Sequence, residues 1–234
     1  MVPHQHSAHG DFLFQTFRRF ILPQLFTEAE NLYSGCDLKH MNRYGIFIEP
    51  QGDLRKYILQ KKRDVRERFG WQNYVDHPPH STLFCGNLSG EPEWLMRLER
   101  LGLASFVISC NAVRVFPDDP LCGGTDTLTV EIDSDAARHA QMLIANELKC
   151  YTEKSAQHFS NHHMQESWDT YGYQFVGAHW IPHMTIASIN AEYSGSYVKE
   201  ITQTPINFAF ECNAISVWKI SGDTHTKIKD ILLT

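Results

Sequence analysis

Two short motifs in this sequence each place a threonine two residues after a histidine. The first reads His80-Ser81-Thr82-Leu83 and the second reads His183-Met184-Thr185-Ile186. Histidine titrates near neutral pH, so one imidazole can remove a proton while another supplies one. A threonine hydroxyl can donate a hydrogen bond to a phosphate oxygen and stabilise the charge that develops there. The four side chains therefore suit acid–base cleavage of a phosphodiester bond.

The two motifs belong to an internal repeat. The second histidine follows the first by 103 positions, and Cys110-Asn111-Ala112 recurs as Cys212-Asn213-Ala214 after 102 positions. Two separate landmarks with nearly the same offset indicate two similar halves. Side chains at i and i+2 of a strand point to one face, so each histidine projects together with its threonine. A pseudo-twofold axis between the halves would bring one such pair from each side.

Each half is predicted to alternate strands with helices. The apolar patterns predict strands at 44–50, 80–86, 106–116, 127–132, 183–187, 208–220 and 227–233. Helices are predicted at 53–69, 92–101, 134–149 and 191–203. In the helix at 53–69, Lys61, Lys62 and Arg63 fall on the polar face. The second half is longer before its motif, and we place this insertion in the polar stretch 150–175.

These elements predict an α+β, bilobal fold with a pseudo-twofold axis. Two antiparallel sheets are expected to face a central groove, with helices on the outer sides and the His-Thr pairs at the groove floor. We expect lobe one at about 43–120 and lobe two at about 121–234, which together form one domain. Apolar residues at helical spacing before this domain predict an N-terminal helical extension over residues 1–42.

At these motifs the sequence resembles the 2H phosphoesterase superfamily, whose signature is one His-x-Ser/Thr-x motif in each of two related lobes. The resemblance covers roughly residues 44–220, and Ser81 departs from the hydrophobic preference at its position. It implies a metal-independent phosphodiesterase without a cofactor, acting on a 2′,3′-cyclic phosphate or a 2′,5′-linked nucleotide or short oligonucleotide. It also implies that His80 and His183 are catalytic and that Thr82 and Thr185 bind the substrate phosphate. We favour His183 as the base.

Two other functions stay open at this point. The same residues could process RNA ends or join RNA through 2′,5′ bonds, and a protein without turnover could act as a nucleotide-binding sensor. A metal site is a third idea, because His158, His162, His163 and His179 crowd the second half. Their spacing matches no standard ligand pattern, so we predict no metal. We expect these histidines in a solvated loop, with a lid over the substrate as its functional interpretation.

Aromatic and basic residues near the motifs are candidates for further substrate contacts. Phe84, Tyr173 and Trp180 are candidates for stacking on a nucleobase, with core packing as the alternative for Phe84. Arg114 and Lys219 are the best-placed cations for further phosphates, although a solvated strand face explains them equally.

Composition limits the class of protein. The net charge of −6 disfavours binding along long nucleic acid, which requires many lysines and arginines, but allows a small phosphorylated ligand. The 6 cysteines form no CxxC pair, so we expect free thiols in a reducing compartment and a cytoplasmic protein. The apolar stretch 12–26 is interrupted by Arg18 and Arg19, so neither secretion nor a membrane span is expected. We expect a monomer.

Overall fold

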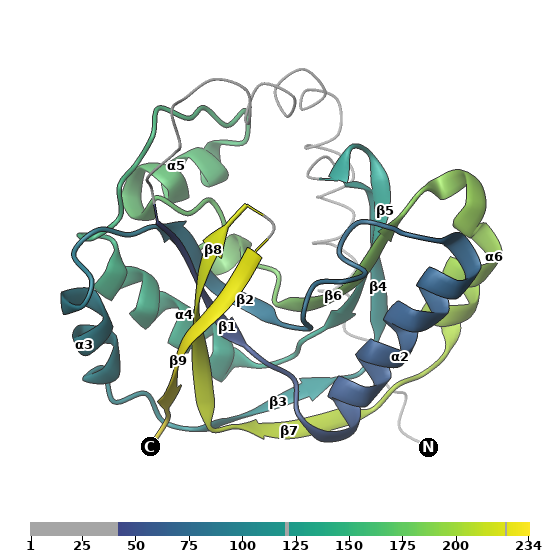
Figure 1. The fold of residues 1–234 in the computed structure, drawn as a ribbon, viewed down its shortest axis with the longest axis horizontal. Helices are drawn as coiled ribbons and strands as arrows, with labels where there is room; N and C mark the ends of the chain where they lie inside the picture. The colour runs from purple at the N-terminus through teal and green to yellow at the C-terminus, as the bar shows by residue number, and fades with distance from the viewer. Residues whose placement is uncertain (1–41, 120–121, 223) are drawn as a thin grey trace, which may run out of the picture. The chain divides into compact units, whose positions relative to one another are not determined.

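The computed structural model describes residues 42–119, 122–222 and 224–234 (Figure 1). The chain divides into two units, Met1–Cys36 and Asp37–Thr234, and every described residue lies in the second. The helical extension predicted for residues 1–42 therefore falls outside the described residues, apart from Asn42. In chain order the elements are β1 Arg43–Ile48, α2 Gly52–Phe69, β2 Ser81–Asn87, α3 Glu93–Glu99, β3 Phe106–Cys110, β4 Val113–Asp119, β5 Thr125–Glu131, α4 Asp135–Leu148, α5 His162–Tyr171, η2 Gly177–His179, β6 His183–Ile189, α6 Ala191–Gln203, β7 Phe208–Cys212, β8 Ala214–Ser221 and β9 Thr224–Leu232.

The repeated Cys-Asn-Ala segments break two strands that the sequence pattern predicts as continuous. The predicted strand 106–116 is two strands, β3 and β4, and the predicted strand 208–220 is likewise β7 and β8. Asparagine is unfavourable within strands, and here it marks a change of partner. Strand β3 pairs with β7, whereas β4 pairs with β5 and β8 pairs with β1. Each Cys-Asn-Ala segment is thus a corner at which the chain leaves one sheet for another.

These corners exchange strands across the predicted lobe boundary near residue 120. The paired strands form antiparallel sheets with the orders β2-β1-β8-β9, β4-β5-β6 and β3-β7. Strand β4 of the first half completes the sheet that carries β6, and β8 and β9 of the second half complete the sheet that carries β2. Each motif strand therefore lies in a sheet built from both halves of the sequence.

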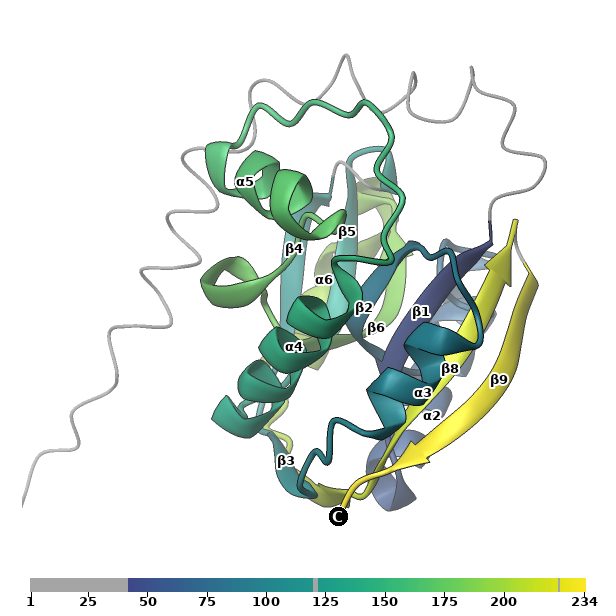
Figure 2. The same ribbon diagram turned by 90° about the vertical axis from the view of Figure 1, so that its left-hand side faces the viewer.

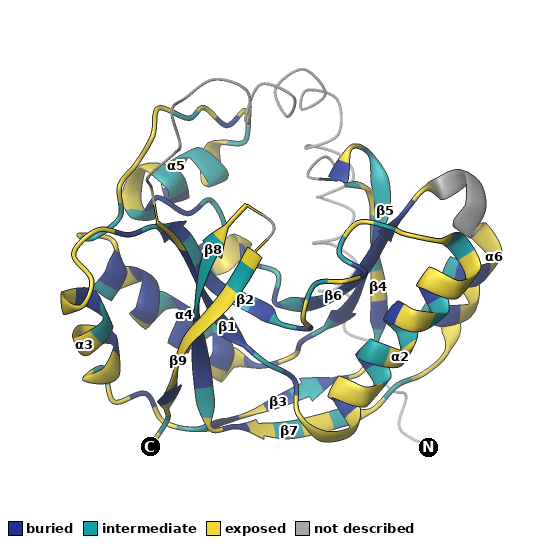
Figure 3. Ribbon diagram, in the orientation of Figure 1, coloured by how far each residue is buried: buried dark blue, intermediate teal, exposed yellow. Residues whose placement is uncertain are grey.

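Helices cover one face of each of the two larger sheets, in agreement with the predicted α+β class (Figures 1 and 2). Helices α3 and α4 pack beside the sheet β2-β1-β8-β9, and α2 and α6 pack beside β4-β5-β6. Tyr44 of β1 meets Trp94 of α3 with ring centroids 4.9 Å apart, so Tyr44 marks the helix-covered face of its sheet. Strands β1, β2, β5 and β6 are largely buried, whereas the edge strand β9 and the outer sides of the helices are exposed (Figure 3).

The insertion contains a helix, α5, where the sequence pattern predicts a solvated loop. The Asn161 side chain accepts hydrogen bonds from the backbone amides of His163 and Met164, which caps the first turn. Gly172 ends the helix at φ 67°, and a Cβ atom at this position would lie 2.2 Å from Thr152 Cγ2. Only glycine therefore fits this C-terminal position. The cap residues specify a helix although the segment is polar.

The cysteines of the described residues are free thiols: Cys85, Cys110, Cys122, Cys150 and Cys212. This agrees with the prediction of free thiols, and Cys36 lies outside the described residues. Among the described residues, no helix has both the length and the hydrophobicity that crossing a bilayer requires.

Candidate active site

Each predicted motif lies at the start of a strand. Residue His80 immediately precedes β2, and His183 is the first residue of β6. Strands β2 and β6 contact each other although they belong to different sheets. Both histidines and both threonines of the motifs are half-buried, whereas the residue after each histidine is buried. The expected alternation is therefore present, and the two His-Thr pairs share a face on each strand.

This face is the one that the helices leave uncovered, and we call it the motif face. Directly paired residues of neighbouring strands lie on the same face of a sheet. Thr82 pairs with Phe47, which alternates along β1 with the helix-facing residues Ile46 and Ile48. In the other sheet, Thr185 pairs with Thr129 and His183 pairs with Glu131. The motif face of each sheet can therefore be traced from the strand register.

Both motifs end in a β-bulge. In β2, Thr82 pairs with Phe47 and Phe84 pairs with Ile46, so Leu83 is an additional residue. In β6, Thr185 pairs with Thr129 and Ala187 pairs with Leu128, so Ile186 is the additional residue. A bulge turns the strand locally and re-aims the side chains before it. Leu83 and Ile186, the fourth residues of the two motifs, are fully buried. They thus fix the end of each His-Thr pair to the core.

The two histidines make matching hydrogen bonds. Nδ1 of His80 lies 2.7 Å from the carbonyl oxygen of Pro78, and Nδ1 of His183 lies 2.7 Å from the carbonyl oxygen of Ile181. A carbonyl oxygen only accepts, so each Nδ1 carries a proton and donates it. In the neutral ring, Nε2 is then the unprotonated nitrogen. Each histidine is held in the tautomer that leaves Nε2 to exchange a proton with a substrate.

Aromatic rings position both imidazoles. The Phe47 ring lies 4.1 Å from the His80 ring, and the Phe116 ring meets the His183 ring edge-on at 5.0 Å. Gly45 makes room for Phe47, because a Cβ atom on Gly45 would lie 2.1 Å from the Phe47 ring. The sequence pattern did not single out either phenylalanine, because both contacts depend on strand pairing.

The two imidazoles have different electrostatic surroundings. Burial lowers the pKa of His80 to about 4, and positive charge on His225, His77 and Lys62 acts in the same direction. Burial also lowers the pKa of His183, but the carboxylate of Asp119 opposes this effect. Asp119 is itself oriented by a hydrogen bond of 2.7 Å from the Thr127 hydroxyl. The charged groups that act on His80 are thus cationic, whereas a carboxylate acts on His183.

Thr129 adds a hydroxyl to the motif face that the sequence pattern did not identify. It lies directly opposite Thr185, is 1% exposed, and its Oγ1 has no hydrogen-bond partner among the described residues. A buried hydroxyl without a partner costs stability, so native proteins seldom retain one without a use. Because this oxygen is enclosed, Thr129 packs beside Thr185 and does not reach a ligand directly.

Lys62 of α2 is hydrogen-bonded to the segment before the first motif and to the second motif. The sequence pattern placed Lys62 on the polar face of its helix, but the side chain is buried, with 4% exposed. Its ammonium donates to the carbonyl oxygen of Tyr74 at 2.6 Å and to that of Ile186 at 2.8 Å. Tyr74 lies in the segment that leads to His80, and Ile186 is the bulged residue of the second motif. One side chain thus ties both motifs to α2.

The other predicted contact residues lie elsewhere. Phe84, Tyr173 and Trp180 are at most 7% exposed and belong to the hydrophobic core, where Tyr173 packs edge-on against Phe84 at 5.5 Å. Burial of this kind leaves no open ring face for a nucleobase. Arg114 lies on the motif face opposite Thr129 and pairs with Glu131 at 2.9 Å. Lys219 pairs in register with Tyr44 and therefore lies on the helix-covered face.

The histidines of the insertion form a separate cluster. Among the residues that the structure describes, His162, His163 and Glu166 have ligand atoms within 4.8 Å of one another, and all three are exposed. The His179 ring stacks on His163 at 4.0 Å. Neither motif histidine belongs to this group, so the cluster does not bear on the chemistry of the motifs.

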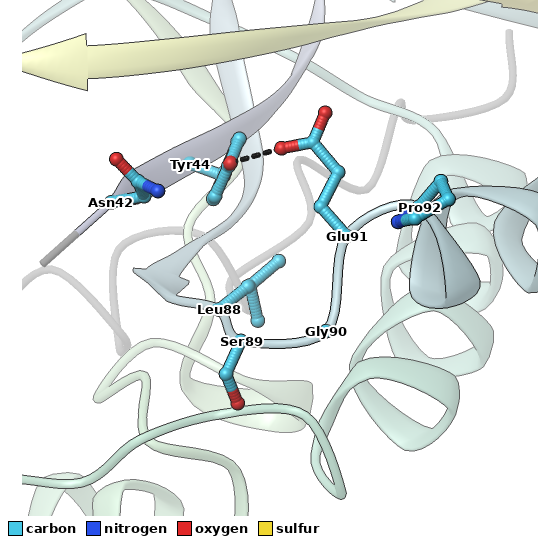
Figure 4. Close-up of a pocket in the computed structure, with 7 residues that line it drawn as sticks. All are labelled: Asn42, Tyr44, Leu88, Ser89, Gly90, Glu91 and Pro92. Carbon is cyan, nitrogen blue, oxygen red and sulfur yellow. Dashed lines mark hydrogen bonds between the residues drawn. The ribbon is translucent and has the colours of Figure 1, made fainter.

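Two surface pockets are lined by residues outside the motifs. One, of about 470 Å³, lies between the start of β1 and the turn before α3, where the Tyr44 hydroxyl is hydrogen-bonded to Glu91 (Figure 4). The other, of about 500 Å³, is lined by α3 and the Glu147 side chain of α4. Neither contains a motif residue, and we assign no function to either pocket.

Comparison with known proteins gives a family and a fold. A model of the 2′-5′ RNA ligase superfamily matches residues 51–224. The protein TT0787 of Thermus thermophilus aligns with a TM-score of 0.56 and 15% identity, over 82% of this chain and 97% of that chain. LigT of E. coli, solved in complex with 3′-AMP, aligns with a TM-score of 0.51 and 14% identity, over 83% and 99% of the two chains. At these identities the structures establish the fold alone. No curated protein sequence matches this chain.

Proposed function

This chain belongs to the 2′-5′ RNA ligase superfamily, and we propose that it is a metal-independent phosphodiesterase that cleaves a 2′,3′-cyclic phosphate or a 2′,5′ linkage. The proposed substrate is a nucleotide or a short oligonucleotide. The family match includes both motifs, which supports the 2H phosphoesterase chemistry that the sequence resemblance implies. LigT, a structural relative, has been solved with 3′-AMP, which supports a nucleotide as the kind of ligand.

The matched geometry of the two histidines is the observation that carries this proposal. In each motif, a backbone carbonyl oxygen 2.7 Å from Nδ1 holds the imidazole in place. This leaves Nε2 of each ring as the nitrogen that can accept a proton. Each histidine is followed by a half-buried threonine on the same face. Two fixed imidazoles, one from each of two neighbouring strands, are what attack and departure on opposite sides of a phosphorus atom require.

The reaction on a 2′,3′-cyclic phosphate uses the two histidines in opposite protonation states. The base removes a proton from water as the water oxygen forms a bond to phosphorus. The bond from phosphorus to one ribose oxygen breaks, and the acid gives its proton to that oxygen. The product is a phosphomonoester beside a free hydroxyl, and the two histidines exchange protons with solvent to start again. Thr82 and Thr185 donate hydrogen bonds to the non-bridging oxygens.

The surroundings of the histidines favour His80 as the base and His183 as the acid. This reverses our preference from the sequence. The general acid must hold a proton, and the carboxylate of Asp119 stabilises protonated His183. Burial, and then the charges of His225, His77 and Lys62, disfavour a proton on His80, which therefore stays neutral and able to accept one. The sequence could not reveal this difference, because the two motifs are alike.

Incubation of the protein with a substrate panel in the presence of a chelator tests the proposal. The panel contains 2′,3′-cyclic mononucleotides, ADP-ribose cyclic phosphate and 2′,5′-oligoadenylate. We expect turnover of at least one compound, and a fall in kcat of about 10²- to 10⁴-fold in each of His80→Ala and His183→Ala. His139→Ala, an exposed histidine of α4, is the matched control and should retain full turnover. A kcat that stays within about tenfold of the natural value in either motif variant would contradict the two-histidine mechanism.

The same panel separates the alternatives. A nucleotide sensor would bind a panel compound without turning it over, and a ligase would produce longer oligonucleotides from ends that carry a cyclic phosphate. Activity that disappears with the chelator would contradict the metal-independent mechanism. The free cysteines support a reducing compartment, and we propose the cytoplasm as the place of action.

A further inference from the structure

Two histidines and a glutamate lie together on the first two turns of α5. Counted along this helix, Glu166 follows His162 by four positions and His163 by three. Residues at these two spacings are neighbours on one side of a helix. Nδ1 of His162 lies 4.0 Å from Oε2 of Glu166, in agreement with this spacing. The helix thus brings one carboxylate beside two imidazoles.

These three side chains, which we call the α5 triad, are close enough to share one metal ion. One ligand atom from each of them lies within 4.8 Å of the ligand atoms of the other two. Around a zinc ion with bonds of about 2.1 Å, tetrahedral ligand atoms lie about 3.4 Å apart. All three side chains are exposed, so rotation between staggered rotamers closes this difference without a change in the backbone.

The kinds of ligand atom in the α5 triad favour Zn²⁺ over the common hard cations. Imidazole nitrogen suits zinc and its neighbours among the transition metals, whereas Mg²⁺ and Ca²⁺ take oxygen ligands. Two histidines and one carboxylate are a known set of zinc ligands, with water as the fourth. The carboxylate of Glu166 also offsets part of the charge of the ion.

Neighbouring groups hold part of the α5 triad in place. The His179 ring of η2 stacks on the His163 ring, with centroids 4.0 Å apart and an angle of 21° between the ring planes. The Asn161 side chain caps the turn that carries His162 and His163. Both contacts reduce the conformational freedom that the ligands lose when an ion binds. The site is therefore partly preorganised by a second segment of the chain.

We propose that the α5 triad binds one Zn²⁺ ion, with water in the remaining coordination position. The site is separate from the two motifs, and it does not rest on the proposed phosphodiesterase activity, which needs no metal. The sequence pattern predicted a solvated loop and no metal in this segment. In a helix, however, ligands three and four positions apart meet on one side, which is how helical metal motifs work.

Isothermal titration calorimetry with ZnCl₂ on the whole chain tests the site. The natural chain should bind one equivalent of Zn²⁺ more than a chain that carries both His162→Ala and His163→Ala. The other histidines, including those before residue 42, are the same in these two chains, so any Zn²⁺ that they bind cancels in the comparison. A chain with His139→Ala and His158→Ala, two exposed histidines outside the triad, is the matched control and should bind as many equivalents as the natural chain.

Glu166→Gln separates metal ligation from a change in folding, because it keeps the size of the side chain and removes the carboxylate. It should weaken Zn²⁺ binding at this site by at least about tenfold, since loss of even an outer-shell partner of a metal commonly costs that much. An excess of Mg²⁺ of about a hundredfold should leave the Zn²⁺ bound, because histidine nitrogens do not suit Mg²⁺.

Three results would overturn the site. They are equal numbers of Zn²⁺ equivalents in the natural chain and the double histidine variant, an unchanged affinity in Glu166→Gln, and displacement of the Zn²⁺ by Mg²⁺. Binding of Zn²⁺ is measured without substrate, whereas turnover is measured in a chelator. Either proposal can therefore fail while the other stands.

Discussion

Replacement of Lys62 by methionine is the sharpest test of how the two motifs are held in place. Methionine is close to lysine in length and suits a buried position, so the change removes the charge and the donors with little change in volume. The carbonyl oxygens of Tyr74 and Ile186 lose the bonds of 2.6 Å and 2.8 Å that they accept in the natural chain. Both motifs then lose a shared support.

The expected loss of stability is the difference between two opposing effects. Two hydrogen bonds from a charged donor contribute about 3–6 kcal/mol together. Burial of the ammonium opposes this, because it lowers the pKa of Lys62 from 10.5 to about 8, a shift equivalent to about 3 kcal/mol. We therefore expect Lys62→Met to lower the free energy of unfolding by up to about 3 kcal/mol at pH 7.

The pH dependence of this difference identifies its cause. Between pH 8 and 10.5, the unfolded chain holds the Lys62 proton while the folded chain has released it. The unfolded state then binds more protons, so the free energy of unfolding of the natural chain rises with pH across this window. Methionine has no proton to release, and the other groups titrate in both chains. The gap between the two chains should therefore widen by about 2 kcal/mol between pH 7 and pH 9.5.

Urea denaturation of both chains at pH 7 and pH 9.5, followed by circular dichroism, measures this gap. Lys61→Met is the matched control, because Lys61 lies one position along the helix and pairs with Asp64 near the surface at 3.2 Å. We expect the control to lose less than about 0.5 kcal/mol, with no dependence on pH. A Lys62→Met chain as stable as the natural one at pH 9.5, or a gap that stays constant with pH, would refute the reasoning.

Three further substitutions test the motif face. Thr129→Val should raise the free energy of unfolding by about 1 kcal/mol in urea denaturation, because it removes a buried hydroxyl without a partner, and should leave kcat unchanged; a loss of stability would contradict this account. Gly45→Ala should lower the free energy of unfolding by about 1–3 kcal/mol in urea denaturation, because its methyl group overlaps the Phe47 ring, and unchanged stability would contradict this contact. In the profile of kcat/KM against pH, the acidic limb should follow the pKa of His80, about 4, and the alkaline limb should follow the pKa of His183, which burial lowers below its ordinary value. Asp119→Asn should move its alkaline limb to lower pH and leave its acidic limb in place, and a shift of the acidic limb instead would reverse the roles of the two histidines.

Local patterns in the sequence were sufficient to predict the motif strands and the helices. Alternation over two residues placed each histidine and threonine on one face, and apolar spacing placed helices within a few residues of α2, α3, α4 and α6. The corners at Cys110-Asn111-Ala112 and Cys212-Asn213-Ala214 were missed, because apolar residues continue on both sides of each. A change of strand partner leaves little trace in a hydrophobic pattern.

The missed site residues depend on contacts between distant parts of the sequence. Lys62 lies among other cations, and its burial follows from the packing of α2 against β6, more than 100 residues later. The contact between the rings of His77 and His225 depends on strand pairing, and neither residue has a local signal in the sequence. Helix α5 is a different case, because Asn161 and Gly172 are cap residues that a closer reading of the polar insertion could have used.

The exchange of strands between the halves explains how two similar motifs can act differently. The motif strands β2 and β6 carry the same residue types, so the motifs alone would give two equivalent histidines. Each sheet, however, is completed by strands from the other half, β4 beside β5 and β6, and β8 with β9 beside β1 and β2. Strand β4 brings Asp119 toward His183, whereas β9 brings His225 toward His80. The exchanged strands therefore supply the asymmetry that the proposed acid–base catalysis needs, and their sequences can diverge while the motifs stay alike.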